Sequence, residues 1–179
     1  KGKSSGIYFA LPTQLTSNRI HERVDAFLSR ILENRQEALL LHGMAWLERF
    51  RQQRMGQDAA PNRSWFEQGK RGILAPFAVG TIDQALFSVM NVRHGALRTF
   101  GLAGKTVILD EVHSYDAYTG TILDALVAQL RAIGCTVIIL SATLTARRRA
   151  ALMAGDTAST AYPLISAAPV GDEAREIAC

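Results

Sequence analysis

Short apolar runs alternate along the chain with longer segments of helical spacing. Four runs are rich in β-branched or aromatic residues and predict buried strands: Gly6–Leu11, Leu74–Gly80, Thr106–Leu109 and Thr136–Leu140. The segment Glu37–His42 is ambiguous, because its three consecutive leucines could begin a helix or form a fifth strand. We favour the strand.

Between these runs, apolar residues recur at the spacing of amphipathic helices, from Ile20 to Leu32 and from Ile122 to Leu130. Shorter helices are expected from Thr81 through Met90 and over Thr145–Met153. Nearly all-apolar strands that alternate with helices predict an α/β fold, in which a parallel sheet carries helices on both faces. Ligands should then bind beyond the carboxyl ends of the strands.

Two adjacent carboxylates stand where the strand Thr106–Leu109 ends. A carboxylate at a strand end, beside a phosphate site, can hold the Mg²⁺ that bridges nucleotide phosphates, usually through water, and Asp110 suits that role. The next carboxylate can polarise an attacking water, so Glu111 is the candidate general base. An acidic pair more often begins a solvated loop, but His113 and the motif that follows favour the catalytic interpretation.

Two small hydroxyl residues, Ser141 and Thr143, follow the strand Thr136–Leu140. Their hydroxyls could sense the state of a nucleotide through hydrogen bonds to His113 or Asp110. Alone, a Ser-Ala-Thr sequence is usually a helix cap. It becomes informative here because it follows the acidic strand by about 30 residues, the length of one helical crossover.

Three polar residues, Thr13, Gln14 and Asn18, lie where the first strand meets a long helix. Exposed amides and hydroxyls at the start of a helix suit contacts with sugar and phosphate groups. These residues are therefore candidates for binding a nucleic acid.

A similar junction follows the second strand, at Gly80, Thr81 and Gln84. Thr81 and Gln84 have the spacing of a capping box, and the helix amides that such a box leaves free could still contact phosphate. Gly80 indicates that the backbone approaches something closely at this point.

A nucleotide-driven motor needs a glycine-rich loop that ends in Gly-Lys-Ser/Thr, between a strand and a helix. Gly2-Lys3-Ser4 matches only the tail of that motif, and a strand rather than a helix follows it. We expect the loop to lie upstream of Lys1 in a longer protein. By itself, this chain is expected to bind ATP poorly or not at all.

Composition and charge exclude few functions for this chain. The 179 residues suit one domain, and the formal charge of +4 is compatible with a nucleic-acid partner. Cys135 lies in an apolar run and Cys179 ends the chain, which argues against a disulfide framework and fits a reducing, cytoplasmic setting. No apolar run approaches the roughly 20 residues of a membrane crossing.

Four motifs resemble, in order and spacing, those of superfamily 2 helicases of the DExH type: Leu11–Gln14, Val79–Gln84, Asp110–Asp116 and Leu140–Leu144. Longer strings are more specifically similar to the CRISPR-associated helicase-nucleases of type I interference systems. These strings are Gly6–Asn18, Lys70–Gln84 and Gly101–Tyr118, and the resemblance covers essentially the whole chain.

The resemblance implies a RecA-like sheet of the P-loop NTPase type, truncated at its phosphate-loop strand. Residues 1–160 would form the first helicase lobe without its Walker A segment, and residues 161–179 would begin the linker toward a second lobe. The parent would be an ATP-dependent DNA helicase that uses ATP and Mg²⁺ and acts with a single-stranded DNA nuclease domain. A guide-RNA surveillance complex would recruit it to foreign DNA.

The same resemblance assigns roles to individual residues. Asp110 and Glu111 would serve Mg²⁺ and water activation, while His113, Ser141 and Thr143 would couple hydrolysis to movement. Single-stranded DNA would lie near a group of polar residues and a glycine: Thr13, Gln14, Asn18, Gly80, Thr81 and Gln84.

The resemblance also predicts an open edge in the sheet. In such sheets the strand that leads to Ser141 usually lies between the acidic strand and the phosphate-loop strand. Without the latter, we expect an exposed edge that tends to associate with other chains.

Two other functions stay open at this point. The chain could belong to a DExH helicase that acts on RNA or in another pathway, because that superfamily shares the acidic and Ser-Ala-Thr motifs. It could also be a non-catalytic RecA-like module that docks a protein or a nucleic acid, since the phosphate loop is missing.

Overall fold

A computed structural model gives the fold of the chain. It describes residues 4–32, 37–41, 71–92, 94–112, 117–153, 159, 161–169 and 175–178. The chain forms two compact units, Lys1–Leu140 and Ser141–Cys179, which are described separately. The boundary between the units, after Leu140, lies before residue 160, where we predicted the end of the first lobe. The assignment of residues 1–160 to a lobe and of residues 161–179 to a linker stays a prediction.

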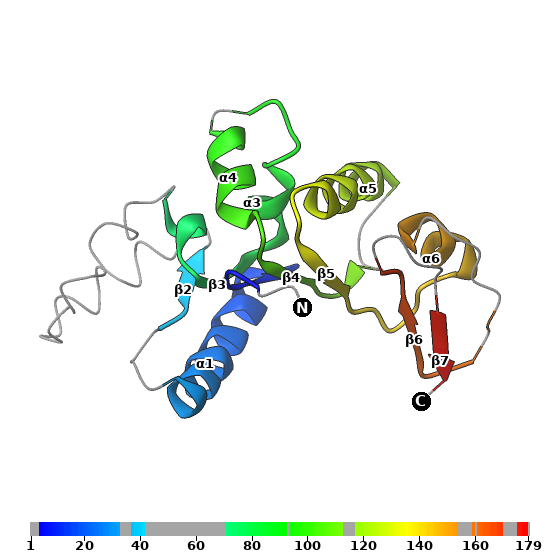
Figure 1. The fold of residues 1–179 in the computed structure, drawn as a ribbon, viewed down its shortest axis with the longest axis horizontal. Helices are drawn as coiled ribbons and strands as arrows, with labels where there is room; N and C mark the ends of the chain where they lie inside the picture. Colours follow the sequence, from blue (N-terminus) through cyan, green and yellow to red (C-terminus); the bar gives the residue numbers. More distant parts are fainter. Residues whose placement is uncertain are drawn as a thin grey trace, which may run out of the picture. The chain divides into compact units, whose positions relative to one another are not determined.

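The first unit contains a five-stranded sheet in the order β2-β3-β1-β4-β5, and every pair of neighbours is parallel (Figure 1). Its strands are β1 (Ile7–Leu11), β2 (Leu39–Leu41), β3 (Phe77–Thr81), β4 (Thr106–Leu109) and β5 (Thr136–Ile139). The predicted α/β fold with a parallel sheet is confirmed, and so is the ambiguous short strand.

Strand β3 begins later than predicted. The segment Gly72–Leu74 forms a short 3-10 helix, η1, and the chain becomes extended only after Pro76. The carbonyl of Pro76 accepts a hydrogen bond from the backbone N–H of Ile7 at 2.8 Å, which starts the pairing of β3 with β1. Apolar character alone did not reveal this turn.

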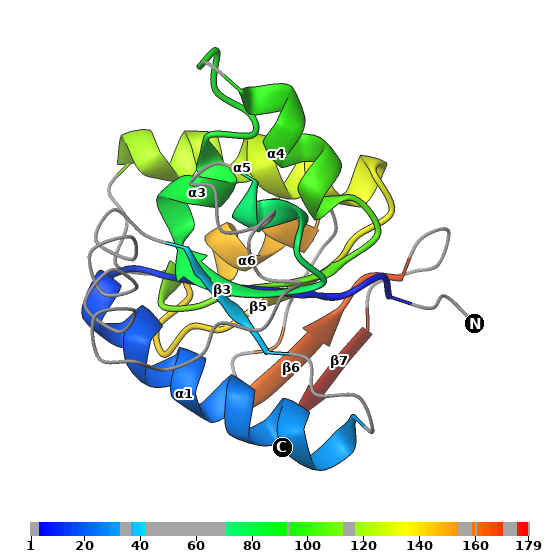
Figure 2. The same ribbon diagram turned by 90° about the vertical axis from the view of Figure 1, so that its left-hand side faces the viewer.

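Helices cover both faces of the sheet (Figures 1 and 2). Helix α1 (Gln14–Ile31) lies on one face, and α3 (Ile82–Leu86), α4 (Gly95–Leu102) and α5 (Ala117–Ala132) lie on the other. The helix predicted from Thr81 through Met90 is shorter, because i to i+3 hydrogen bonds at Ser88 and Val89 convert its end into turns. None of the helices in the described ranges combines the length and apolar character that a membrane crossing needs.

One part of the hydrophobic core lies between the sheet and α1. Leu11 and Val79 from the strands pack there with Leu28 from α1 and with Ala38, which precedes β2. Two side chains of α1 also bind the backbone of Ala38: Asp25 accepts its N–H at 2.6 Å, and the His21 ring lies 2.7 Å from its carbonyl. These contacts hold the start of β2 against α1.

Strand β5 stands at one edge of the sheet and, within the described part of the first unit, pairs with β4 alone. Ile138 is 41% exposed, and Leu140, directly after the strand, is 43% exposed, whereas apolar residues of a parallel sheet are usually covered. The predicted open edge is therefore present. Its tendency to associate stays a prediction.

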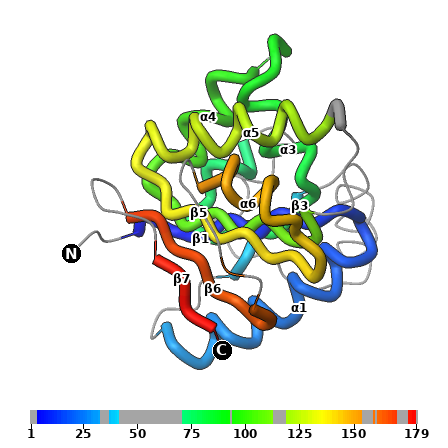
Figure 3. The backbone as a smooth tube through the Cα atoms, turned by 90° about the vertical axis from the view of Figure 1, so that its right-hand side faces the viewer, coloured from blue at the N-terminus to red at the C-terminus, as the bar shows by residue number. Residues whose placement is uncertain are grey.

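In its described residues, the second unit contains helix α6 (Ala146–Met153) and two antiparallel strands, β6 (Leu164–Ala167) and β7 (Arg175–Ala178) (Figure 3). Thr145 caps α6, because its hydroxyl accepts the N–H of Arg148 at 3.2 Å. The cap of this helix thus lies two residues after the Ser-Ala-Thr sequence.

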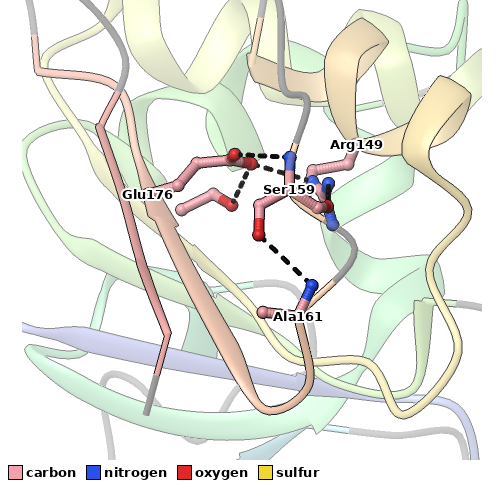
Figure 4. Close-up of polar contacts among 5 residues, drawn as sticks. Arg149, Ser159, Ala161 and Glu176 are labelled. Atoms are coloured by element: carbon pink, nitrogen blue, oxygen red, sulfur yellow. Dashed lines mark hydrogen bonds and ion pairs between the residues drawn. The ribbon is translucent and has the colours of Figure 1, made fainter.

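A half-buried carboxylate connects the parts of this unit (Figure 4). Glu176 on β7 lies 3.2 Å from the Arg149 guanidinium of α6, and it accepts hydrogen bonds from the Ser159 N–H at 3.0 Å and the Ser166 hydroxyl at 3.2 Å. Arg149 also donates to the carbonyl of Ser159. Because Arg149 and Glu176 are only 14% and 18% exposed, their ion pair is little screened by water.

Candidate functional site

Three polar positions meet at the carboxyl edge of the sheet. Strand β1 lies between β3 and β4, and its register pairs Leu11 with Thr81 on one side and Ala10 with Leu109 on the other. Because all three strands are parallel, the residues that end or follow them share one edge. The structure therefore brings Thr13, Thr81 and Asp110 to the same end of the sheet, as the sequence predicts.

The acidic pair forms a turn directly after β4. The N–H of Asp110 donates to the carbonyl of Ala10 at 3.0 Å, so this residue is still bonded to β1. Its carboxylate accepts the N–H of Glu111 at 3.0 Å. Glu111 is exposed and has a φ of 57°, in the left-handed region that residues other than glycine rarely adopt. Such backbone strain is concentrated at functional sites.

Three of the predicted site residues are not placed relative to this pair. His113 lies outside the described residues. Ser141 is half-buried and Thr143 is exposed at the start of the second unit. The coupling roles of these residues stay predictions.

The start of α1 is organised for an anion. Thr13 occupies the N-cap position, and its hydroxyl accepts the N–H of Thr16 at 3.2 Å. No acidic residue lies in the first turn, so the positive end of the helix dipole is not neutralised there. Gln14 is exposed and Asn18 is half-buried on this helix. The remaining N–H groups of a helix start suit a phosphate group.

The capping box predicted at the start of α3 is wrong. Thr81 is the N-cap residue, but its side chain makes no capping hydrogen bond. The side-chain carbonyl of Gln84 instead accepts a hydrogen bond from Arg98 of α4 at 3.4 Å. In a capping box, the Gln84 side chain would accept the backbone N–H of Thr81. Here it accepts a hydrogen bond from Arg98, which lies 14 residues later in the chain. Thr81 is only 7% exposed, which leaves its hydroxyl little surface for a ligand.

The structure explains Gly80 by packing inside the protein. A Cβ atom at this position would lie 2.4 Å from the carbonyl oxygen of Leu41 on β2 and 2.8 Å from the hydroxyl of Tyr8 on β1. The backbone at Gly80 does come close to other atoms, as we predicted, and these atoms belong to the neighbouring strands β1 and β2. A contact of Gly80 with nucleic acid stays a prediction.

Two residues near this edge were missed from the sequence. Tyr8 is fully buried and donates its hydroxyl to the carbonyl of Thr81 at 3.0 Å. Arg98 reaches Gln84 and places its guanidinium 5.3 Å from the ring centre of Phe87, and partial burial lowers its pKa. Both belong to apolar segments and match no functional motif. The small residues Ala78 and Gly80, which lie beside Tyr8 on β3, were the only sequence feature that pointed to this hydrogen bond.

The described residues at this edge do not by themselves form a magnesium site. Among the described residues, no group of three or more His, Cys, Asp or Glu side chains could hold a metal ion. Mg²⁺ in nucleotide sites commonly binds one or two carboxylates together with phosphates and water. The single carboxylate of Asp110 at the end of β4 fits that donor set.

The chain is similar to several characterised proteins. It is 44% identical over 160 residues to the CRISPR-associated endonuclease/helicase Cas3 of Thermus thermophilus, an alignment that covers 83% of this chain and 17% of that protein. The crystal structure of T. fusca Cas3 with ADP matches with a TM-score of 0.79 and 34% identity, over 97% of this chain and 21% of that one.

A third match is a chain of a CRISPR RNA-guided surveillance complex in a pre-nicking state. It has a TM-score of 0.63 and 28% identity, and the match covers 96% of this chain and 18% of that one. No protein-family model matches the chain. The chain thus spans about a fifth of the length of these proteins.

Proposed function

Because this chain is homologous over most of its length to a segment of the Cas3 CRISPR-associated nuclease/helicases, we propose that it forms most of the first RecA-like lobe of such an enzyme. The enzyme would use ATP to move along single-stranded DNA, and a nuclease domain elsewhere in the protein would cleave foreign DNA. Residues 1–160 would belong to the lobe, and residues 161–179 would begin the connection to a second lobe.

The observation that carries this proposal is the position of the acidic pair. Asp110 and Glu111 follow β4 at the edge of the sheet where α1 also begins, at Thr13. Nucleotides and other ligands bind at the carboxyl ends of the strands in sheets of this kind. One edge thus presents carboxylates suited to a nucleotide and a helix start suited to a phosphate backbone.

On the nucleotide side, each residue has a distinct role. Asp110 would hold Mg²⁺ through water, and the ion would neutralise the charge that develops on the phosphates. Glu111 would accept a proton from the attacking water as general base. His113, Ser141 and Thr143 would couple hydrolysis to movement of the lobe. The crystal structure of T. fusca Cas3 with ADP supports the use of a nucleotide.

On the nucleic-acid side, backbone groups and short polar side chains would contact sugar and phosphate. Thr13, Gln14 and Asn18 would act at the start of α1, whose uncompensated dipole favours phosphate. Gly80, Thr81 and Gln84 would act at the start of α3. Because Gly80 and Thr81 are buried, we assign their contribution to the backbone rather than to the Thr81 hydroxyl.

A guide-RNA surveillance complex is the proposed partner. The similarity to a chain in a CRISPR RNA-guided surveillance complex before nicking supports it. The complex would open the foreign DNA and present a single strand to the motor.

Substitution of the acidic pair tests the enzymatic function in the full-length protein. Glu111→Gln keeps the size of the side chain but removes the base, so we expect ATP hydrolysis to fall by about 100-fold or more. DNA binding should stay within about twofold. Glu22→Gln, an exposed position on α1, is the matched control and should hydrolyse ATP normally. Normal DNA-stimulated ATP hydrolysis and unwinding by Glu111→Gln or Asp110→Asn would refute the assignment.

A further inference from the structure

Tyr8 lies on the face of the sheet that carries the start of α3. Phe9 and Val79 belong to the core beside α1, and side chains alternate between the faces of a strand. Tyr8 on β1 and the residues Ala78 and Gly80 on β3 therefore share the opposite face. The register pairs Tyr8 directly with Ala78, the first of these two small residues.

The two small residues leave room for the tyrosine ring to extend toward the carboxyl end of β3. The Tyr8 hydroxyl lies 2.8 Å from the point that a Cβ atom of Gly80 would occupy. Beyond Gly80 it donates to the carbonyl of Thr81 at 3.0 Å. A side chain on Gly80 would displace this hydroxyl, so the glycine and the tyrosine act as a pair.

The hydrogen bond from the Tyr8 hydroxyl to the Thr81 carbonyl lies at the N-cap residue of α3. The helix has five residues, too few to be stable by itself, and the hydroxyl of its N-cap residue Thr81 makes no capping bond. Tyr8 supplies a side-chain hydrogen bond to the backbone of that residue from the centre of the sheet. The Tyr8 hydroxyl is protonated at neutral pH and can donate this bond, and burial raises its pKa further.

We propose that Tyr8 is a positioning residue, whose buried hydroxyl fixes the Thr81 carbonyl and so holds the Gly80–Thr81 backbone, which we assign to contact with single-stranded DNA. The inference rests on the proposed function, because it assumes that this junction binds single-stranded DNA. Tyr8 itself is fully buried and touches no ligand. It acts through the backbone of Gly80 and Thr81.

Tyr8→Phe removes only the hydroxyl and keeps the ring that fills the space above Ala78. In the full-length protein, we expect the dissociation constant for a single-stranded oligonucleotide to rise about five- to tenfold, the effect of losing one buried hydrogen bond. The DNA concentration that half-saturates ATP hydrolysis should rise equally, while the KM for ATP stays unchanged. Tyr162→Phe, at a position that is 81% exposed, is the matched control.

Amide hydrogen exchange gives a second measurement that does not depend on DNA. Tyr8→Phe should speed exchange in Ile82–Leu86 but leave exchange in α5 unchanged. Unchanged DNA affinity and unchanged exchange in this variant would overturn the role of Tyr8. An equal weakening of DNA affinity and KM for ATP would also overturn it, because a general structural defect would then explain both. If the unsubstituted protein does not bind single-stranded DNA, the proposed function fails first.

Discussion

Lys105 offers a test of how burial shapes this fold. It directly precedes β4, is only 4% exposed, and donates its ammonium group to the carbonyls of Ile73 at 2.8 Å and Ala75 at 2.6 Å. These carbonyls belong to the η1 turn before β3. Burial lowers the pKa of Lys105 to about 8, since the apolar surroundings disfavour the charged form.

The lowered pKa has a definite consequence for stability. The charged lysine costs the folded state free energy below pH 8, and this cost is relieved as the pH rises from about 8 toward the unfolded value of 10.5. Each pKa unit corresponds to about 1.4 kcal/mol, so the full gain is about 3 kcal/mol, of which about 1 kcal/mol appears by pH 9. The neutral amine still has two N–H donors for the two carbonyls.

The free energy of unfolding in urea at pH 7, 8 and 9 measures this gain. Lys105→Met should be less stable at every pH, because both carbonyls lose their donor, but its stability should lack the rise. Both proteins should carry Cys135→Ala, since burial raises the pKa of this thiol and its ionisation would oppose the gain at high pH. Parallel pH curves for the two proteins would refute the reasoning.

Two further predictions concern packing. Gly80→Ala should lower the free energy of unfolding by about 2 kcal/mol, because the new methyl group would lie 2.4 Å from the Leu41 carbonyl oxygen. Gly134→Ala has no atom within 4 Å of the new methyl group and only a strained φ of 77°, so it should cost about 1 kcal/mol. An equal cost for the two variants would contradict the packing argument. Glu176→Gln removes the ion pair with Arg149, so proteases should cleave the β6–β7 pair faster. Strands β1 to β5 should keep their protection from hydrogen exchange. Unchanged proteolysis would show that the ion pair does not stabilise the second unit.

The strands could be predicted because each is an almost uninterrupted apolar run. A parallel strand is covered on both faces, so its residues need not alternate with polar ones. That rule identifies β4 and β5 almost to the residue. It misplaces the start of β3, because Leu74 and Ala75 are apolar for a different reason: they form the buried turn that Lys105 holds.

The candidate site could be predicted only where local sequence determines it. Asp110 directly follows β4 and Thr13 lies two residues after β1, and the parallel pairing of these strands brings both to one edge. The capping box at Thr81 failed because Gln84 finds a partner on α4, a contact that no local pattern encodes. The left-handed conformation of Glu111 was equally hidden, since nothing in its residue type requires it.

The hydrogen bonds of β1 connect the two halves of the proposed site. On one side, the carbonyl of Ala10 accepts the N–H of Asp110; on the other, Tyr8 donates to the carbonyl of Thr81. At its carboxyl end, β1 leads through Thr13 into α1. A single strand thus bonds to the backbone of the residue assigned to Mg²⁺ and to the junction of β3 with α3, and it leads into the start of α1. Hydrogen bonds and rigid secondary-structure elements can carry energetic coupling between sites, and β1 is the element that bonds to both halves of the proposed site.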